Sequence, residues 1–85
     1  MTTMAPTGTP LDAIKLDLRG LKCPLPVLRV RKALIAARTG SLLVVHCTDP
    51  MAAIDVPNLV RETGDIIEQQ GDADGALVFH IRKAA

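Results

Sequence analysis

The residues best able to do chemistry lie in a short run around Cys23. Lys22 precedes this cysteine, Pro24 follows it, and Pro26 stands two positions further on. A cysteine beside a cationic residue or at a helix N-terminus has a lowered pKa, and its thiolate form is the nucleophile. Pro24 suits the first position of a helix, where its missing N–H would have had no partner. We therefore expect Cys23 to be an exposed thiolate at a helix start, stiffened by two prolines and suited to act as a nucleophile or a sulfur acceptor.

Other kinds of cysteine chemistry fit the surroundings of Cys23 less well. A redox pair of the Cys-x-x-Cys type needs a second thiol at position 26, which Pro26 occupies. A peroxidatic thiol would also lack a nearby resolving cysteine. The chain has neither an HExxH pattern nor a phosphate-binding glycine loop, which argues against a stand-alone hydrolase. The structural alternative is that Cys23 is a small buried hydrophobe, since free cysteine is among the most buried residue types.

The second cysteine, Cys47, ends an apolar run at residues 41–47. Alternation along a strand turns Cys47 inward and His46 outward, so we expect a core thiol, with a resolving or auxiliary sulfur site as the alternative. The same alternation places His80 on the outer face of its own strand. Two cysteines without zinc-type spacing, one of them facing inward, favour neither a metal site nor a bound cofactor.

Two aspartates stand near the start of the second expected helix. Asp49, in the Thr-Asp-Pro run at 48–50, is expected to cap that helix. Because Asp49 lies at the same sheet edge as Cys23, it could also help to dock a partner. Asp55, two residues before Pro57, is expected to be a structural turn or hydrogen-bonding residue.

Hydrophobic periodicity predicts six elements around these residues. Ile14, Leu16 and Leu18 alternate with polar residues, which is the period-two pattern of a half-buried strand. The expected strands are residues 14–19, 41–47, 66–70 and 77–82, and the expected helices are residues 24–38 and about 50–63. This β-α-β-α-β-β order predicts an α+β fold, a two-layer α/β sandwich in which both helices cover one face of a mixed four-stranded sheet.

Glycine and proline mark the expected ends of these elements. Gly40 and Gly64 are expected to end the two helices. Pro57 should kink the second helix or split it into two short pieces, because its ring prevents one backbone hydrogen bond. Residues 71–75, rich in Gly and Asp, are expected to form the loop of a closing hairpin.

The 85 residues are enough for one compact domain. Residues 1–12, rich in Thr, Pro and Gly, are expected to be a flexible tail before a domain at residues 13–85. The tail lacks the basic and apolar regions of a signal peptide, and no apolar run approaches the roughly 20 residues of a membrane span. We therefore expect a cytosolic protein with reduced thiols and no membrane partner.

The net charge is only +1, but basic residues gather in one stretch: Arg19, Lys22, Arg29, Arg31, Lys32 and Arg38. This stretch is expected to be the solvated face of a helix, or else a basic rim around Cys23. A second class of function, a non-catalytic regulatory or nucleic-acid-binding module, would use this helix. The near-neutral charge and the single aromatic residue, Phe79, argue against direct nucleic-acid binding.

Three short motifs resemble those of one known family. The run Gly-Leu-Lys-Cys-Pro-Leu-Pro-Val at 20–27 is similar to the Cys-Pro-x-Pro signature of the TusA/SirA family of small sulfur-carrier proteins. Thr-Asp-Pro at 48–50 and Asp-Val-Pro at 55–57 resemble that family's second and third motifs, and the resemblance covers about residues 14–83. Leu25 is a departure, because the carriers best associated with tRNA thiolation have an acidic residue between the prolines.

The resemblance implies a fold, a chemistry and a set of partners. It implies a sheet with strand order 1-2-4-3 and a persulfide carried on Cys23. A cysteine desulfurase or a rhodanese would donate the sulfur. A downstream acceptor protein would take it, in tRNA thiolation, molybdenum-cofactor assembly or sulfur oxidation. The activity would be of the sulfurtransferase type, that of a carrier rather than of a stand-alone catalyst. We expect Lys22, Pro24, Pro26 and Asp49 to support Cys23 in this role.

Overall fold

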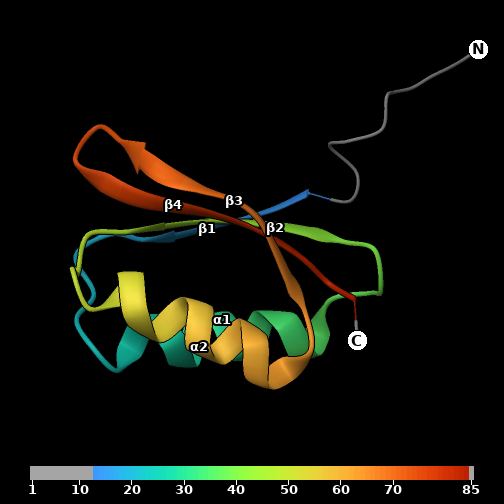
Figure 1. Ribbon diagram of the computed structural model, residues 1–85. Helices are drawn as coiled ribbons and strands as arrows, with labels where there is room; N and C mark the ends of the chain where they lie inside the picture. Colours follow the sequence, from blue (N-terminus) through green and yellow to red (C-terminus); the bar gives the residue numbers. More distant parts are fainter. Residues whose placement is uncertain (1–12, 85) are drawn as a thin grey trace, which may run out of the picture.

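The computed structural model of the protein describes residues 13–84 (Figure 1). In that range the chain forms β1 (Ala13–Leu18), α1 (Leu25–Ala36), β2 (Leu42–Cys47), α2 (Ala52–Thr63), β3 (Ile66–Ala73) and β4 (Ala76–Arg82). The expected order of elements is therefore confirmed. Neither of these helices is long and apolar enough to cross a membrane. The tail expected at residues 1–12 lies outside the described residues.

The strands of this range make one sheet in the order β1-β2-β4-β3. β1 and β2 run parallel, while β4 is antiparallel to both of its neighbours, β2 and β3. Figure 1 shows α1 and α2 lying against the same face of this sheet. The two-layer sandwich and the strand order 1-2-4-3 are thus both confirmed.

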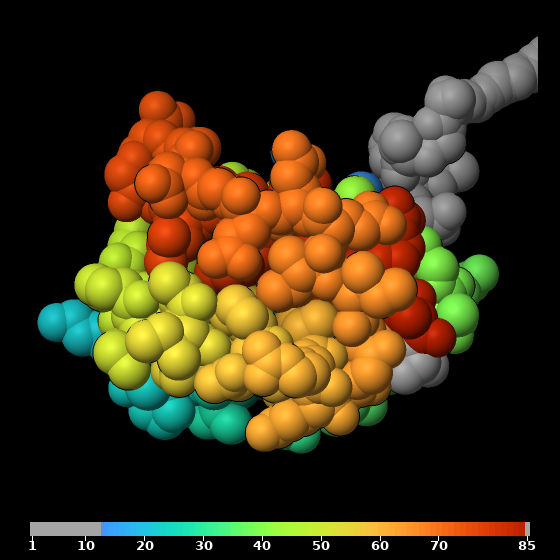
Figure 2. All heavy atoms as spheres, in the orientation of Figure 1, coloured from blue at the N-terminus to red at the C-terminus, as the bar shows by residue number. Residues whose placement is uncertain are grey.

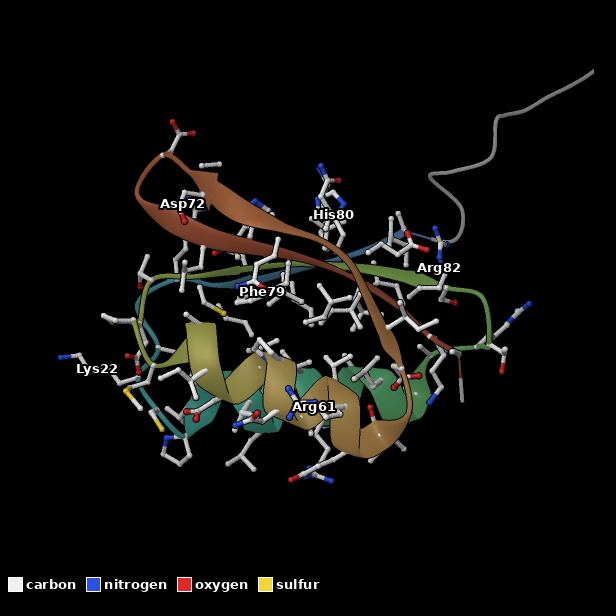
Figure 3. All side chains as sticks on the ribbon, in the orientation of Figure 1. Lys22, Arg61, Asp72, Phe79, His80 and Arg82 are labelled. Carbon is white, nitrogen blue, oxygen red and sulfur yellow. The ribbon has the colours of Figure 1, made fainter. Side chains whose placement is uncertain are left out.

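The core lies between the sheet and the two helices. Phe79, the one aromatic residue of the sequence, is fully buried there, and Figure 3 shows it on the side of the sheet that the helices cover. Cys47 is also fully buried, as the alternation along its strand predicted. His80 projects from the opposite face of the sheet (Figure 3). The helices complete the core with Val30, Leu34, Val56, Leu59 and Val60.

The hairpin that closes the sheet is tighter than the sequence predicted. The expected loop at residues 71–75 was too long, because β3 continues to Ala73, which pairs with Ala76. Asp74 and Gly75 form the turn, with φ angles of 52° and 79°. Two consecutive positive φ angles match the twist of the flanking strands, and Asp-Gly is a preferred pair for such a turn. Of the expected loop at residues 71–75, only these two residues therefore lie outside the strands.

The expected end of α1 was wrong, and of the two effects expected of Pro57, a kink or a split, the split does not occur. Helix α1 ends at Ala36 and does not extend to Arg38. Pro57 lies inside α2, but it does not split this helix, which runs from Ala52 to Thr63 as one element. A proline removes a single hydrogen bond from a helix, and packing of the apolar face can hold the rest together. Gly64 ends α2 as expected, with a left-handed φ of 82°.

The fold brings the starts of the two helices to the same edge of the sheet. Because β1 and β2 are parallel neighbours, Leu18 and Cys47 lie opposite each other where the strands end. The loops that follow lead into α1 and α2 at the left of Figure 1. The carboxyl ends of the strands are where open α/β sheets usually place their functional sites.

Candidate active site around Cys23

Cys23 lies in the loop between β1 and α1. Its thiol is exposed, whereas that of Cys47 is buried. Figure 2 shows the loop that follows β1, coloured cyan, projecting at one end of the molecule. The expected helix-cap geometry needs correction, because α1 begins at Leu25 and Pro24 occupies the N-cap position. Cys23 therefore lies one residue before the N-cap, rather than at the N-cap with Pro24 as the first helical residue.

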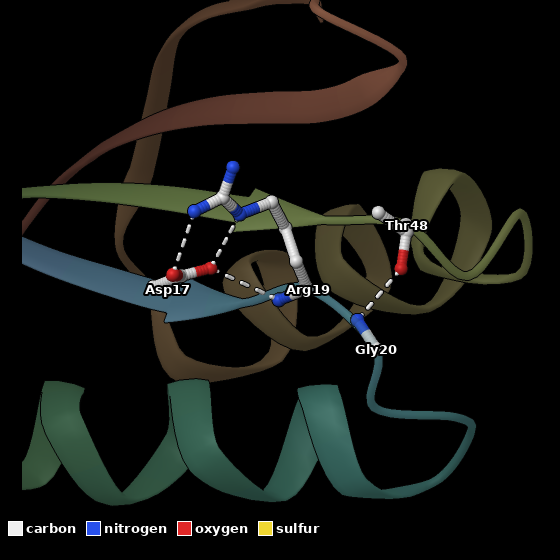
Figure 4. A network of polar contacts seen from close by, with 4 residues as sticks. All are labelled: Asp17, Arg19, Gly20 and Thr48. Atoms are coloured by element: carbon white, nitrogen blue, oxygen red, sulfur yellow. Dashed lines mark hydrogen bonds and ion pairs between the residues drawn. The ribbon is translucent and has the colours of Figure 1, made fainter.

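The two loops at this sheet edge are tied together by consecutive residues. The hydroxyl of Thr48 accepts the backbone N–H of Gly20 at 2.8 Å, as Figure 4 shows. The carboxylate of Asp49 accepts the backbone N–H of Cys23. The Thr-Asp pair after β2 thus holds both the beginning and the end of the loop that carries the thiol.

Asp49 serves the start of α2 as well as the Cys23 loop. Its second oxygen accepts the N–H of Met51 at 3.0 Å, which resembles the capping role expected from the sequence. The N–H groups of Met51 and Cys23 and the charge of Lys22 lower the pKa of Asp49. Asp49 is therefore a carboxylate at neutral pH, with both oxygens engaged by backbone donors.

Asp55 is the side chain in direct contact with the thiol. Sγ of Cys23 donates a hydrogen bond to Oδ2 of Asp55 over 3.2 Å. This hydrogen bond, together with some burial and the charges of Asp55 and Asp49, raises the pKa of Cys23 above its ordinary value. The expectation of a thiolate with a lowered pKa was therefore wrong. The main cause is the carboxylate of Asp55 hydrogen-bonded to Sγ, to which partial burial and the charge of Asp49 add.

Asp55 was expected to be a structural turn or hydrogen-bonding residue, and it does accept a hydrogen bond, but its place beside Cys23 was not predicted. A signal was available, because Cys23 and Asp49 were expected at the same sheet edge and each precedes an expected helix. The first turns of α1 and α2 must then lie at one edge, and Asp55 is the acidic residue in the first turn of α2. Adjacency of the two helix starts was thus the clue to this contact.

The prolines that flank Leu25 occupy different environments. Pro26 is buried in the first turn of α1, whereas Pro24 is exposed beside Cys23. Leu25 between them is 46% exposed. Lys22 is exposed and projects away from the molecule in Figure 3. Of the four expected supporting residues, Pro24 lines the groove with Cys23, and Asp49 accepts a hydrogen bond from the backbone of Cys23.

Part of the expected basic rim is neutralised by acidic partners. Arg19 makes a two-pronged contact with Asp17, with distances of 2.7 and 2.8 Å (Figure 4). This contact lowers the pKa of Asp17 to about 2. Arg31 lies 3.5 Å from Glu62 of the neighbouring helix. These pairs favour a charged surface of mixed sign over a uniformly basic one.

A groove between α1 and α2 leads away from the thiol. It has a volume of about 380 Å³ and is lined by Cys23, Pro24, Val27, Arg31, Asp55, Asn58, Leu59 and Glu62. The lining residues recur every three or four positions on both helices, so the groove follows the helices for about two turns from their N-terminal ends. Val27 and Leu59 are apolar members of its lining, and Arg31 and Glu62, furthest along the helices from Cys23, form an ion pair. The groove offers space for a segment of another molecule next to Sγ.

Cys47 does not take part in this site. It is 0% exposed, and burial raises the pKa of its thiol to about 11. Within residues 13–84, no cluster of three or more His, Cys, Asp or Glu side chains could hold a metal ion. The chemistry of the described site therefore rests on Cys23 and the carboxylates around it.

The fold and the site define a small two-layer α/β protein with an exposed thiol at the sheet edge, hydrogen-bonded to a carboxylate. A family model described as sulfurtransferase TusA matches residues 14–83. The chain belongs to the TusA family.

Relatives of known name and structure agree with this membership. The sulfur carrier protein TusA of Pseudomonas paraeruginosa is 40% identical over 77 residues, which cover 89% of this chain and 95% of the relative. The sulfur carrier protein TusA of Allochromatium vinosum is 37% identical over 70 residues, or 82% of this chain and 92% of the relative. A SirA-like protein from Desulfitobacterium hafniense, solved by crystallography, has the same fold. Its TM-score is 0.75 at 23% identity, over 85% of this chain and 99% of the other.

Proposed function

We propose that this protein is a sulfur carrier that accepts a sulfane sulfur as a persulfide on Cys23 and relays it to a partner protein. The observation that carries the proposal is the exposed Cys23 thiol, whose backbone is held by Asp49 and which opens onto the inter-helix groove. The names of the relatives support it, since both are called sulfur carrier proteins.

The transfer conserves atoms and electrons without an added oxidant or reductant. The Cys23 sulfur attacks the outer sulfur of a donor persulfide, so that a new S–S bond forms while the donor's S–S bond breaks. The donor leaves as a thiolate, as in thiol–disulfide exchange. The reverse attack, by an acceptor thiolate on the outer sulfur of the Cys23 persulfide, unloads the carrier and regenerates the Cys23 thiol.

Proteins rather than small molecules are the proposed exchange partners. A cysteine desulfurase or a rhodanese would donate the sulfur, and a downstream acceptor would receive it. Exposed apolar side chains at the helix starts suit a protein contact, namely Leu25, Leu28, Met51 and Ile54. Lys22 would attract an anionic persulfide on the incoming partner. The pathway served would be tRNA thiolation, molybdenum-cofactor assembly or sulfur oxidation; Leu25 between the prolines is a departure from the carriers best associated with tRNA thiolation.

Intact mass before and after incubation with a persulfide donor tests the proposal. Sulfur loading should add about 32 Da, and a thiol reductant should remove it, because persulfidation is a reversible modification of cysteine. Cys23→Ser should abolish the mass gain without unfolding the protein, since the side chain is exposed. Cys47→Ala should load normally. A mass gain that persisted in Cys23→Ser would refute the assignment of the sulfur to Cys23.

A further inference from the structure

We propose that Asp55 is the proton acceptor of the reaction, taking the thiol proton of Cys23 as the cysteine attacks the donor's outer sulfur. The inference rests on the proposed sulfur-carrier function and names a catalytic residue for it. It starts from the contact already described, in which Sγ donates to Oδ2 of Asp55 over 3.2 Å. A general base must lie within hydrogen-bond reach of the proton that it removes, and Asp55 meets that requirement before any substrate arrives.

The other charged groups near the thiol are engaged elsewhere or have the wrong chemistry. Both oxygens of Asp49 accept backbone N–H groups. Glu62, further along the groove, lies against Arg31 at 3.5 Å. Lys22 is a cationic side chain and supplies no acceptor for the proton. Asp55 is therefore the carboxylate placed to receive the proton.

The fold holds Asp55 in place for this task. It lies in the first turn of α2, where the partial positive charge of a helix N-terminus stabilises a carboxylate. The next residue, Val56, is fully buried in the core and fixes the orientation of that turn. The Asp55 side chain is itself half-buried and lines the groove beside the thiol. A proton acceptor built on a packed helix needs little reorganisation during the reaction.

The proton balance of loading is then complete. The Cys23 thiol gives its proton to the Asp55 carboxylate, and its sulfur forms the bond to the donor's outer sulfur. The donor's S–S bond breaks, and the donor departs as a thiolate. The carboxylic acid formed on Asp55 returns its proton to the departing thiolate or to water.

A carboxylate that accepts this proton also keeps the resting thiol neutral. The Asp55 hydrogen bond raises the pKa of Cys23, so little free thiolate is present at neutral pH. Because thiolates are the form that oxidants and alkylating agents attack, the exposed cysteine is protected between reactions. Deprotonation is coupled to the attack on the donor and does not precede it.

The isosteric variant Asp55→Asn tests whether Asp55 accepts the thiol proton or only raises the pKa of Cys23 through its charge. The variant should lower the midpoint pH of Cys23 alkylation by iodoacetamide, because the carboxylate that raises the thiol pKa is gone. More thiolate at neutral pH would by itself make loading faster. Loss of the base should instead slow loading from glutathione persulfide by about tenfold or more, since a positioned base contributes about 10² to 10⁴ in rate. The two measurements should therefore move in opposite directions.

Three variants complete the test. Asp55→Ser also removes the carboxylate, and serine is tolerated at helix starts. This variant should show the same lowered alkylation midpoint and the same slowed loading as Asp55→Asn. Asp55→Glu keeps a carboxylate and should recover part of the loading rate. Glu68→Gln removes one negative charge from β3, where Glu68 pairs with Arg82 at 3.0 Å and does not line the groove, so it should leave both measurements near their original values.

Two results would overturn the role of Asp55. Loading by Asp55→Asn and Asp55→Ser at or above the original rate would show that the carboxylate only tunes the thiol. An unchanged alkylation midpoint in both variants would show that the contact is absent in solution. Neither result would affect the sulfur-carrier proposal, which fails separately if the unaltered protein gains no sulfur on Cys23.

Discussion

Asp49 joins the loop that carries Cys23 to the start of α2. One of its carboxylate oxygens accepts the N–H of Cys23, and the other accepts that of Met51 at 3.0 Å. Thr48, the preceding residue, accepts the N–H of Gly20. The position of the thiol therefore depends on acceptors that stand 26 and 28 positions further along the chain than their donors.

Removing either acceptor should release one identified part of the loop. Thr48→Val should speed hydrogen exchange at the amide of Gly20, and Asp49→Ala should speed it at Cys23 and Met51, because amides exchange when their hydrogen bonds open. Exchange rates measured by NMR check both expectations. Each variant is the control for the other, since Gly20 should be unaffected in Asp49→Ala. Unchanged rates at all three amides would mean that other contacts hold the loop.

The two prolines should have separable effects. Pro26→Ala removes buried ring carbons and should lower the free energy of unfolding by about 1–2 kcal/mol, at about 0.8 kcal/mol per buried methylene. Pro24→Ala, at an exposed position, should change stability little but slow sulfur transfer, because the thiol is less rigidly presented. Urea unfolding and transfer kinetics measure the two effects. Equal losses of stability in the two variants would contradict this division.

Cys47→Ser should destabilise the protein while leaving sulfur loading intact. The side chain is fully buried, and a buried hydroxyl without a hydrogen-bond partner costs about 1–3 kcal/mol. Urea unfolding and intact mass after exposure to a persulfide donor are the measurements. Cys47→Ala is the matched control, since it introduces no hydroxyl. Full stability together with lost transfer would make Cys47 an auxiliary sulfur site instead of a core residue.

Cys47 should also make stability fall at alkaline pH. Its pKa in the folded protein is raised to about 11, whereas an unfolded thiol titrates near 8.5. The stabilisation is complete below about pH 8.5. Above that pH the thiol of the unfolded state loses its proton before the buried thiol of the folded state does. The free energy of unfolding therefore falls by up to about 1.4 kcal/mol per pH unit as the pH rises toward 11.

Urea unfolding at a series of pH values between about 8 and 10 measures this fall in the free energy of unfolding. The Cys23→Ser background removes the second thiol, and the chain has no tyrosine to titrate in the same range. Adding Cys47→Ala should flatten the alkaline slope. The same slope with and without Cys47 would contradict the assignment of the effect to this thiol.

Much of the fold followed from local patterns in the chain. The alternation in β2 and β4 placed Cys47 and Phe79 inward, and both are fully buried. A strand with one buried face must alternate, so this information is local and can be read without knowing the neighbours. The hairpin loop could not be predicted in this way. Ala73 belongs to β3 because it pairs with Ala76 across the turn, and that pairing is a property of the folded sheet.

In the candidate site, too, some features could be read from adjacent residues and others depended on the fold. Cys23 and its prolines stood out from adjacent residues, and the Thr-Asp pair at 48–49 was recognisable as a helix start. The protonation state of the thiol was not, because it depends on the groups nearest in space. Asp55, 32 positions away in the chain, lies within hydrogen-bond distance of Sγ and raises its pKa. Lys22, adjacent in sequence, suggested a lowered pKa, but the packing of α1 beside α2 brings a carboxylate to the thiol instead.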